Sequence, residues 1–272
     1  YQKLYKLYFD ARAYDKAWCL AATLCFLKKA DAEQEQFFAD NRPNGPIRPT
    51  NRLNDERWLK DLVHPDQDLL ASKIFEQLWG GVLSVRHQTD KQAGLSKKYE
   101  VNPADSTVTF ARTFGFVANV LGLPCPRLFL RTDVHGGLTA MPTWPLASLS
   151  GSTLLSGYQP NDLMFVVGRH LSDYRQEHYI RTMLRSNTEL KTVLMAGLRF
   201  SGVIPSADPA VEQTAQQLAP KVQQAQQDAL RRLGKRFVEA GARTDIKRWL
   251  QAVELTACRA GSGRRSILFS TS

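Results

Sequence analysis

Asn161-Asp-Leu-Met-Phe-Val-Val-Gly-Arg-His-Leu-Ser-Asp-Tyr-Arg-Gln-Glu-His178 is the stretch around which the rest of the chain is organised. We expect it to form a helix, and residues four apart on a helix lie on the same face. His170 and Tyr174 have that spacing, and Leu171 directly follows the first of them. The stretch therefore predicts one helix face that carries an imidazole and a phenol a single turn apart.

Helices that bind catalytic zinc use this spacing. In the pattern H-E-x-x-H both imidazoles reach one metal ion, and the glutamate activates the bound water. The same register here reads His170-Leu171-Ser172-Asp173-Tyr174. The first ligand is present, but a leucine takes the position of the general base and a tyrosine that of the second ligand. Because leucine cannot accept a proton from a metal-bound water, the register predicts a site without hydrolytic activity.

A second stretch extends the pattern. The lead-in Asp162–Gly168 precedes His170, His178 follows eight residues after it, and Glu254-Leu-Thr-Ala-Cys-Arg-Ala-Gly261 lies some eighty residues further on. From about Ser106 to Gly261 the chain thus resembles the gluzincin zinc metallopeptidases of the CAAX-prenyl-protease and Oma type, whose later helix reads E-x-x-A-D-x-x-G. The resemblance implies a zincin-like peptidase fold, mainly α-helical with a small β-sheet (α+β). It also implies that the segment from Leu138 to Trp144 is the edge strand beside the active site.

The second motif departs from the family as well, because Cys258 stands in place of its usual aspartate. The resemblance therefore implies the fold and argues against the activity. The degenerate active-site positions are His170, Leu171, Tyr174, His178, Glu254 and Cys258. A thiol hydrolase with a dyad of Cys258 and His170 is an alternative, but we identify no oxyanion-hole signature to accompany it.

We expect no metal cofactor. A structural zinc site uses four good ligands and a catalytic site three, whereas the motif positions offer His170 and Glu254 with Tyr174 as an unusual third. A residual zinc site on these three residues is the alternative. Otherwise we expect Glu254 to pair with His170, or with an arginine such as Arg169 or Arg259, since buried polar groups need partners.

The chain predicts two structural parts. Residues 1–40 form a helical hairpin that resembles a tetratricopeptide repeat at Ala13-Tyr-Asp-Lys-Ala17, and we expect further repeats before Tyr1; a generic hairpin is the alternative. Three prolines and a glycine make residues 41–53 a stiff linker. Residues 54–272 form the metallopeptidase-like domain.

Several boundaries follow from capping and periodicity within the second part. We expect one helix from Pro65, one capped by Asp105 or Ser106, a continuous helix over residues 179–200, a long helical stretch broken near Pro220, and a last helix capped by Asp245. Residues 87–103 are polar enough to be a surface loop.

Composition is that of an ordinary globular protein, with 272 residues of which 43% are hydrophobic and 23% charged. The formal net charge is +10, but the basic residues come in scattered pairs, so we expect no nucleic-acid binding. The longest apolar runs are too short for a transmembrane segment. The four cysteines lie in apolar settings, which predicts buried, reduced thiols in a cytoplasmic protein.

These observations together predict a catalytically inactive pseudopeptidase domain that serves as a scaffold or protein-interaction module of a larger repeat protein. The protein partner and the oligomeric state are not encoded in any motif that we recognise. Two alternatives stay open, namely a zinc metallopeptidase with non-standard ligands and a basic module that binds an anionic partner.

Overall fold

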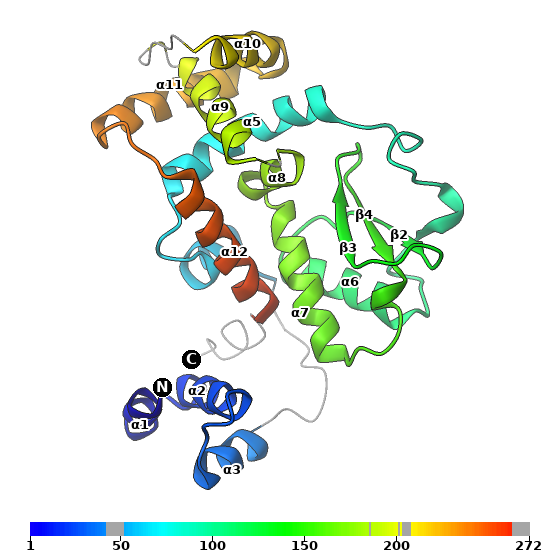
Figure 1. The fold of residues 1–272 in the computed structure, drawn as a ribbon, viewed down its shortest axis with the longest axis vertical. Helices are drawn as coiled ribbons and strands as arrows, with labels where there is room; N and C mark the ends of the chain where they lie inside the picture. Colours follow the sequence, from blue (N-terminus) through cyan, green and yellow to red (C-terminus); the bar gives the residue numbers. More distant parts are fainter. Residues whose placement is uncertain (42–51, 185, 201, 203–207, 263–272) are drawn as a thin grey trace. The chain divides into compact units, whose positions relative to one another are not determined.

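The computed structural model describes residues 1–41, 52–184, 186–200, 202 and 208–262, and the chain divides into two compact units, Tyr1–Thr50 and Asn51–Gly263 (Figure 1). Most of the expected linker over residues 41–53, and the end of the chain from residue 263, lie outside the described residues. None of the described helices is long and apolar enough to cross a membrane.

The first unit contains three helices, α1 (Gln2–Asp10), α2 (Tyr14–Phe26) and α3 (Ala32–Asp40). Its small core consists of Tyr5, Ala17, Ala21 and Leu24. The two alanines let α2 approach its neighbours closely, and Asp31 opens α3 with a reciprocal capping box to Gln34. The expected helical hairpin is therefore present, and a third complete helix follows it.

The second unit is built on a small mixed sheet. Its strands are β1 (Glu100–Val101), β2 (Arg127–Arg131), β3 (Leu138–Met141) and β4 (Ala147–Gly151), in the order β1-β2-β4-β3. Strands β2 and β4 are parallel, and the other neighbours are antiparallel. Strand β3 lies at an edge of the sheet, as the resemblance implied. The chain is mainly helical around this sheet, which confirms the expected α+β class.

The helices of the second unit are α4 (Asp55–Arg57), a π-helical turn (Trp58–Leu62), α5 (Leu69–Arg86), α6 (Thr109–Val120), α7 (Pro160–Leu171), α8 (Gln176–Met183), α9 (Asn187–Arg199), α10 (Pro209–Leu218), α11 (Gln224–Glu239) and α12 (Ile246–Ser262). Helix α5 packs against α8, α9 and α11, and α7 packs against both α6 and α12. Figure 1 shows α7 between α12 on one side and the sheet on the other. The large aromatic side chains in the interior are Trp58, Trp249, Tyr179, Phe75, Phe110, Phe114 and Phe129.

Several predicted boundaries are wrong, and side-chain hydrogen bonds explain them. Helix α5 begins at Leu69 rather than Pro65, because the Asp68 carboxylate accepts from the backbone N–H groups of Leu70 and Ala71, the second and third residues of the helix. Neither Asp105 nor Ser106 caps α6: Ser106 accepts from the Val108 N–H within the preceding loop.

Other boundaries differ as well. The expected helix over residues 179–200 is interrupted at Leu184, and Ser186 caps its second half as α9. Residues 100–101 of the expected loop form β1. The long helical stretch, expected over residues 211–240, starts two residues earlier at Pro209 and is broken at Pro220 as predicted, and Asp245 caps α12 as expected. The cysteines are not buried: Cys19 and Cys125 are exposed, and Cys25 and Cys258 are partly exposed.

Candidate functional site

The motif stretch is not one continuous helix. Helix α7 ends at Leu171, a single 3-10 turn covers Ser172–Tyr174, and Arg175 has an extended backbone before α8 starts. Ser172 ends the helix because its hydroxyl donates back to the Arg169 carbonyl at 2.8 Å, while its own carbonyl lies 3.2 Å from Nδ1 of His178. The helical register that His170 and Tyr174 were expected to share is therefore broken between them.

His170 and Tyr174 still meet, because both are held by the sheet. Oγ of Ser148 on β4 lies 2.8 Å from Nε2 of His170 and 2.6 Å from the Tyr174 hydroxyl. The phenol donates its only proton to the Ala147 carbonyl at 2.6 Å. Each hydroxyl has only one proton to donate, so the Ser148 hydroxyl donates to Tyr174. The Nε2–H of His170 then donates to Ser148. The serine hydroxyl thus bridges the two motif side chains.

This cluster favours uncharged side chains. Burial lowers the pKa of His170 to about 4. Burial also raises the pKa of the Tyr174 phenol well above its usual value, although its bond to Ser148 acts in the opposite direction. At neutral pH both groups are therefore neutral hydrogen-bonding partners, and neither is ready to act as an acid or a base.

Leu171, at the position of the missing general base, belongs to the hydrophobic core. Its side chain is 0% exposed. Removing a leucine side chain of this kind from water contributes about 1.5–3 kcal/mol to stability. The residue therefore contributes to packing at the end of α7 and offers nothing to a solvent-filled cleft.

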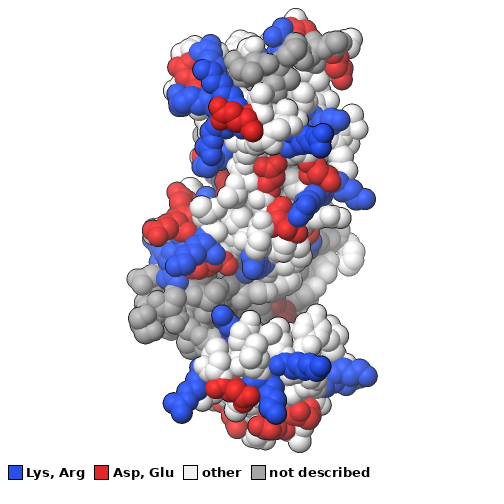
Figure 2. Space-filling view, turned by 90° about the vertical axis from the view of Figure 1, so that its left-hand side faces the viewer, with Lys and Arg blue, Asp and Glu red and all other residues white. Residues whose placement is uncertain are grey.

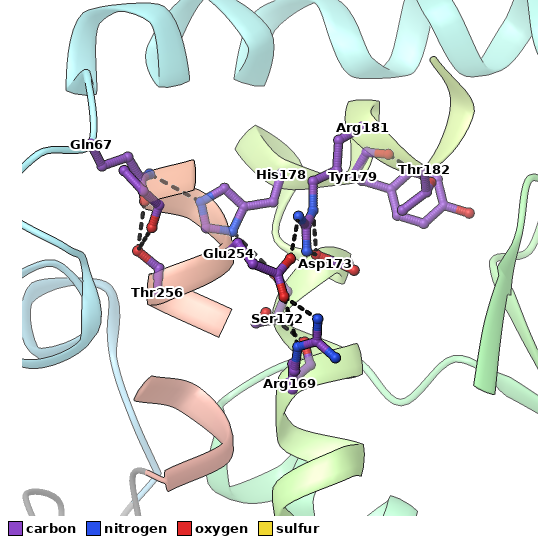
Figure 3. Close-up of polar contacts among 11 residues, drawn as sticks. Gln67, Arg169, Ser172, Asp173, His178, Tyr179, Arg181, Thr182, Glu254 and Thr256 are labelled. Carbon is purple, nitrogen blue, oxygen red and sulfur yellow. Dashed lines mark hydrogen bonds and ion pairs between the residues drawn. The ribbon is translucent and has the colours of Figure 1, made fainter. Parts of the chain in front are cut away.

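His178 is fully enclosed between three helices. Nε2 lies 3.0 Å from the Gln67 amide nitrogen, so the amide donates to Nε2 and the Nδ1–H donates to the Ser172 carbonyl. Gln67 continues the network, because its Oε1 accepts from Thr256 on α12 at 2.8 Å (Figure 3). Burial lowers the pKa of His178 to about 4, against the influence of Glu177. The neutral imidazole ties α8 to the chain before α5 and, through Gln67, to α12.

Glu254, the expected third ligand, is engaged by two arginines. Arg169 donates to one carboxylate oxygen with Nε at 2.7 Å and also with a terminal nitrogen, and Arg181 donates to the other oxygen at 2.9 Å (Figure 3). Burial opposes ionisation of Glu254, but the bonds from Arg181 and Arg169 outweigh it and lower its pKa. Arg181 also contacts Asp173 at 2.5 Å. The four side chains form one ion-pair network between α7, the turn after it, α8 and α12.

Asp173 is the carboxyl group of this network for which burial outweighs the ion pair. Burial raises its pKa to about 6, and Arg181 only partly compensates because it is shared with Glu254. The carboxylate is ionised at neutral pH and accepts protons just below it.

The two motif helices approach closely through glycine. A β-carbon added at Gly168 would lie 2.9 Å from the Ala260 carbonyl oxygen, and one at Gly261 would lie 2.5 Å from the Phe165 carbonyl oxygen. Both glycines come from the stretches that carry the family resemblance. Their role in this chain is to let α7 and α12 lie backbone to backbone.

The expected metal ligands do not converge on one point. His170 hydrogen-bonds to Ser148 on β4, whereas the neighbouring Arg169 holds Glu254 on α12. Tyr174 is occupied by Ser148 and Ala147. In the described part of the chain, no group of three His, Cys, Asp or Glu side chains is placed to hold a metal ion. These residues do not fit the zinc that the family resemblance implies.

The remaining candidates are placed as follows. Cys258 is half-buried on α12, one turn after Glu254. Arg259, an expected partner of Glu254, instead donates to the carbonyls of Leu62 and Val63. The arrangement favours the second of the two expected pairings for Glu254, with Arg169 as its partner.

No family model, curated protein or solved structure matches this chain. The gluzincin and tetratricopeptide resemblances therefore rest on the motif residues alone.

A cleft beside this site was not foreseen. It has a volume of about 520 Å³ and reaches Tyr174 from the side of α5, α8 and the loop between β3 and β4. Glu76 and Trp79 line it from α5, and Trp144 lines it from the loop. The sequence signal that could have predicted this cleft is the three-residue spacing of Glu76 and Trp79. This spacing places both side chains on one face of a helix whose other residues indicate a buried core helix.

Lysine and arginine side chains do not gather into a single basic face in the view of Figure 2, where blue and red residues are interspersed. Many of the arginines are paired, for example Arg127 with Asp90 and Glu100, and Arg248 with Asp66. The chain as a whole still carries a formal net charge of +10.

Proposed function

We propose that this chain is a non-catalytic, metallopeptidase-like domain that acts by binding a protein partner as part of a larger protein. The observation that carries the proposal is the bridge made by Ser148 between His170 and Tyr174. The hydroxyl of a buried strand residue links the two side chains that a zincin would direct at its metal. Both side chains therefore hold α7 and the turn that follows it against the sheet.

The other motif positions support the same proposal. Hydrolysis needs a base beside the first histidine, and Leu171 at that position is packed in the core. A third ligand needs a free carboxylate, and that of Glu254 is bonded by Arg169 and Arg181. His178 has both ring nitrogens in hydrogen bonds. Each side chain that would perform chemistry in a peptidase has a structural partner in this chain.

Binding of a protein partner is supported by exposed aromatic surface. Trp144 is 68% exposed on the loop between β3 and β4, beside the cleft that reaches Tyr174. Exposed tryptophans are enriched in protein–protein contacts, where they often contribute much of the binding energy.

Metal content and hydrolysis test this proposal together. The protein would be purified without a chelator or a metal-affinity tag, analysed for zinc, and incubated with a mixed peptide library that is read by mass spectrometry. We expect zinc well below one ion per chain and no cleavage above that of a His170→Ala variant. Stoichiometric zinc that the variant loses, or cleavage that depends on His170, would overturn the proposal.

A further inference from the structure

The cleft next to Tyr174 combines two indole rings with one carboxylate that is not neutralised. Its volume of about 520 Å³ is within the range of pockets that bind ligands, roughly 300–1,000 Å³. Trp79 and Trp144 come from different elements, and Leu123 and Leu146 add apolar surface between them. Tyr174 is 8% exposed and also lines the cleft. A ligand would meet a largely apolar and aromatic surface there.

The two arginines of the cleft are already paired. Arg127 contacts Asp90 at 2.8 Å and Glu100 at 2.8 Å. Arg175 contacts Asp55 at 2.6 Å and Glu177 at 3.0 Å. Each guanidinium therefore has two carboxylates, and neither is left to attract an anion into the cleft.

The carboxylate of Glu76 differs from these two paired arginines. It is half-buried on α5, and no ion pair joins it to the described residues around the cleft. Burial raises the pKa of its carboxyl group, and the neighbouring Glu177 raises it further, whereas Lys73 and Arg175 lower it. A cation that entered the cleft would stabilise the ionised form of Glu76, which burial and Glu177 both disfavour. The local charge is thus complementary to a positive ligand, although the whole chain carries +10.

The chain itself shows how a guanidinium is held in this region. Arg175 stacks over the ring of Trp58 with 4.9 Å between its Cζ atom and the ring centre, and its nitrogens bond two carboxylates. Glu76, Trp79 and Trp144 line the cleft with the same kinds of groups, a carboxylate and indole rings. The combination of a carboxylate and aromatic rings is well suited to a cation with an apolar stem.

We propose that this cleft binds an arginine side chain of a partner protein, with Glu76 as the pairing carboxylate and Trp144 as an aromatic wall. This inference rests on the proposed protein-binding function and names the chemistry of the partner segment. Arginine fits better than a free small cation because the cleft is open and bordered by the exposed Trp144, so a polypeptide backbone can pass across its rim.

Isothermal titration tests the proposal with a defined probe. The probe is an acetylated and amidated pentapeptide with a central arginine flanked by leucine residues, compared with versions that have citrulline or glutamate at the centre. We expect the arginine peptide to bind at least tenfold more tightly than the citrulline peptide, because only the arginine can form a charged hydrogen bond with Glu76. The glutamate peptide should not bind.

Variants identify the residues involved. Glu76→Gln should weaken the arginine peptide roughly tenfold or more, and Trp144→Leu roughly twofold to fivefold, the range given by an exposed cation–π contact. Glu239→Gln is the matched control, since it removes the same charge from an exposed position on α11 outside the cleft. Circular dichroism checks that each variant is folded. Binding that is absent, equal for citrulline, or unchanged by Glu76→Gln would overturn the proposal.

Two further outcomes separate this inference from the proposed function. Arginine amide is titrated as a second probe. If it binds as tightly as the peptide, the site recognises a small cation and the partner-protein assignment is wrong. Mass spectrometry of the titrated samples reports cleavage. Cleaved peptide would overturn the non-catalytic function, whereas intact peptide that fails to bind would overturn only the arginine site.

Discussion

Replacing His178 should change how stability depends on pH. The imidazole is 0% exposed, receives a hydrogen bond from Gln67 and donates one to the Ser172 carbonyl. Its pKa in the folded chain is about 4, below the ordinary value of 6.5, because burial disfavours the charged form. The unfolded chain therefore binds more protons than the folded chain between these two values. Stability from this group is fully present above pH 6.5 and is lost as the pH falls toward 4.

The size of the effect follows from the two pKa values. Between pH 7 and pH 4.5 the wild-type chain should lose roughly 2 kcal/mol through His178 alone. A His178→Gln variant lacks this titration, although it loses about 1–2 kcal/mol at pH 7 through weaker hydrogen bonds. The free-energy difference between the two proteins should therefore shrink toward zero, or change sign, at pH 4.5.

Urea unfolding at several pH values measures this free-energy difference. The other titrating groups are common to both proteins, so their contributions largely cancel. His87→Gln is the control, because it makes the same substitution at an exposed position. A difference between wild type and His178→Gln that stays constant from pH 7 to pH 4.5 would refute the reasoning. It would mean that the imidazole is hydrated in the folded chain and does not link α8 to Gln67.

Three other substitutions probe the remaining motif positions. Leu171→Glu should cost roughly 3–6 kcal/mol in urea unfolding, from lost burial and a buried carboxyl group, whereas Leu171→Met should cost less than about 1.5 kcal/mol. Arg181→Met should destabilise by roughly 3 kcal/mol at pH 8 and by less at pH 5, because Asp173, with its pKa of about 6, can then become neutral. Gly168→Ala should cost roughly 1–3 kcal/mol through the contact with the Ala260 carbonyl, while Gly80→Ala on α5, where no atom lies within 4 Å, should be neutral or stabilising in thermal melts.

The features that the sequence predicted correctly depend on local signals. Apolar periodicity and capping residues identified α12 with its Asp245 cap and the break between α10 and α11 at Pro220. The edge position of β3 followed from the motif resemblance. The mainly helical class with a small sheet needed no more than these elements.

The failures share a cause, which is a side chain that competes with the helical backbone or depends on a distant partner. Ser172 ends α7 because His178, six residues later, occupies its carbonyl. The Ser148 bridge joins a strand to two residues more than twenty positions away, and no spacing rule connects them. The cysteines were expected to be buried because their neighbours are apolar, but exposure is set by which face of a helix or loop turns outward.

We propose that contacts between side chains, and not a metal ion, hold the motif helices together. Thermal unfolding in a chelator and in one equivalent of zinc per chain tests this most directly, because a ligand that binds only the folded chain raises its melting temperature. For the wild type, the melting curves in chelator and in zinc should coincide, and the same should hold for His170→Ala at its own melting temperature. A zinc-dependent rise of several degrees in the wild type, absent from His170→Ala, would contradict the account and restore a metal site at the end of α7.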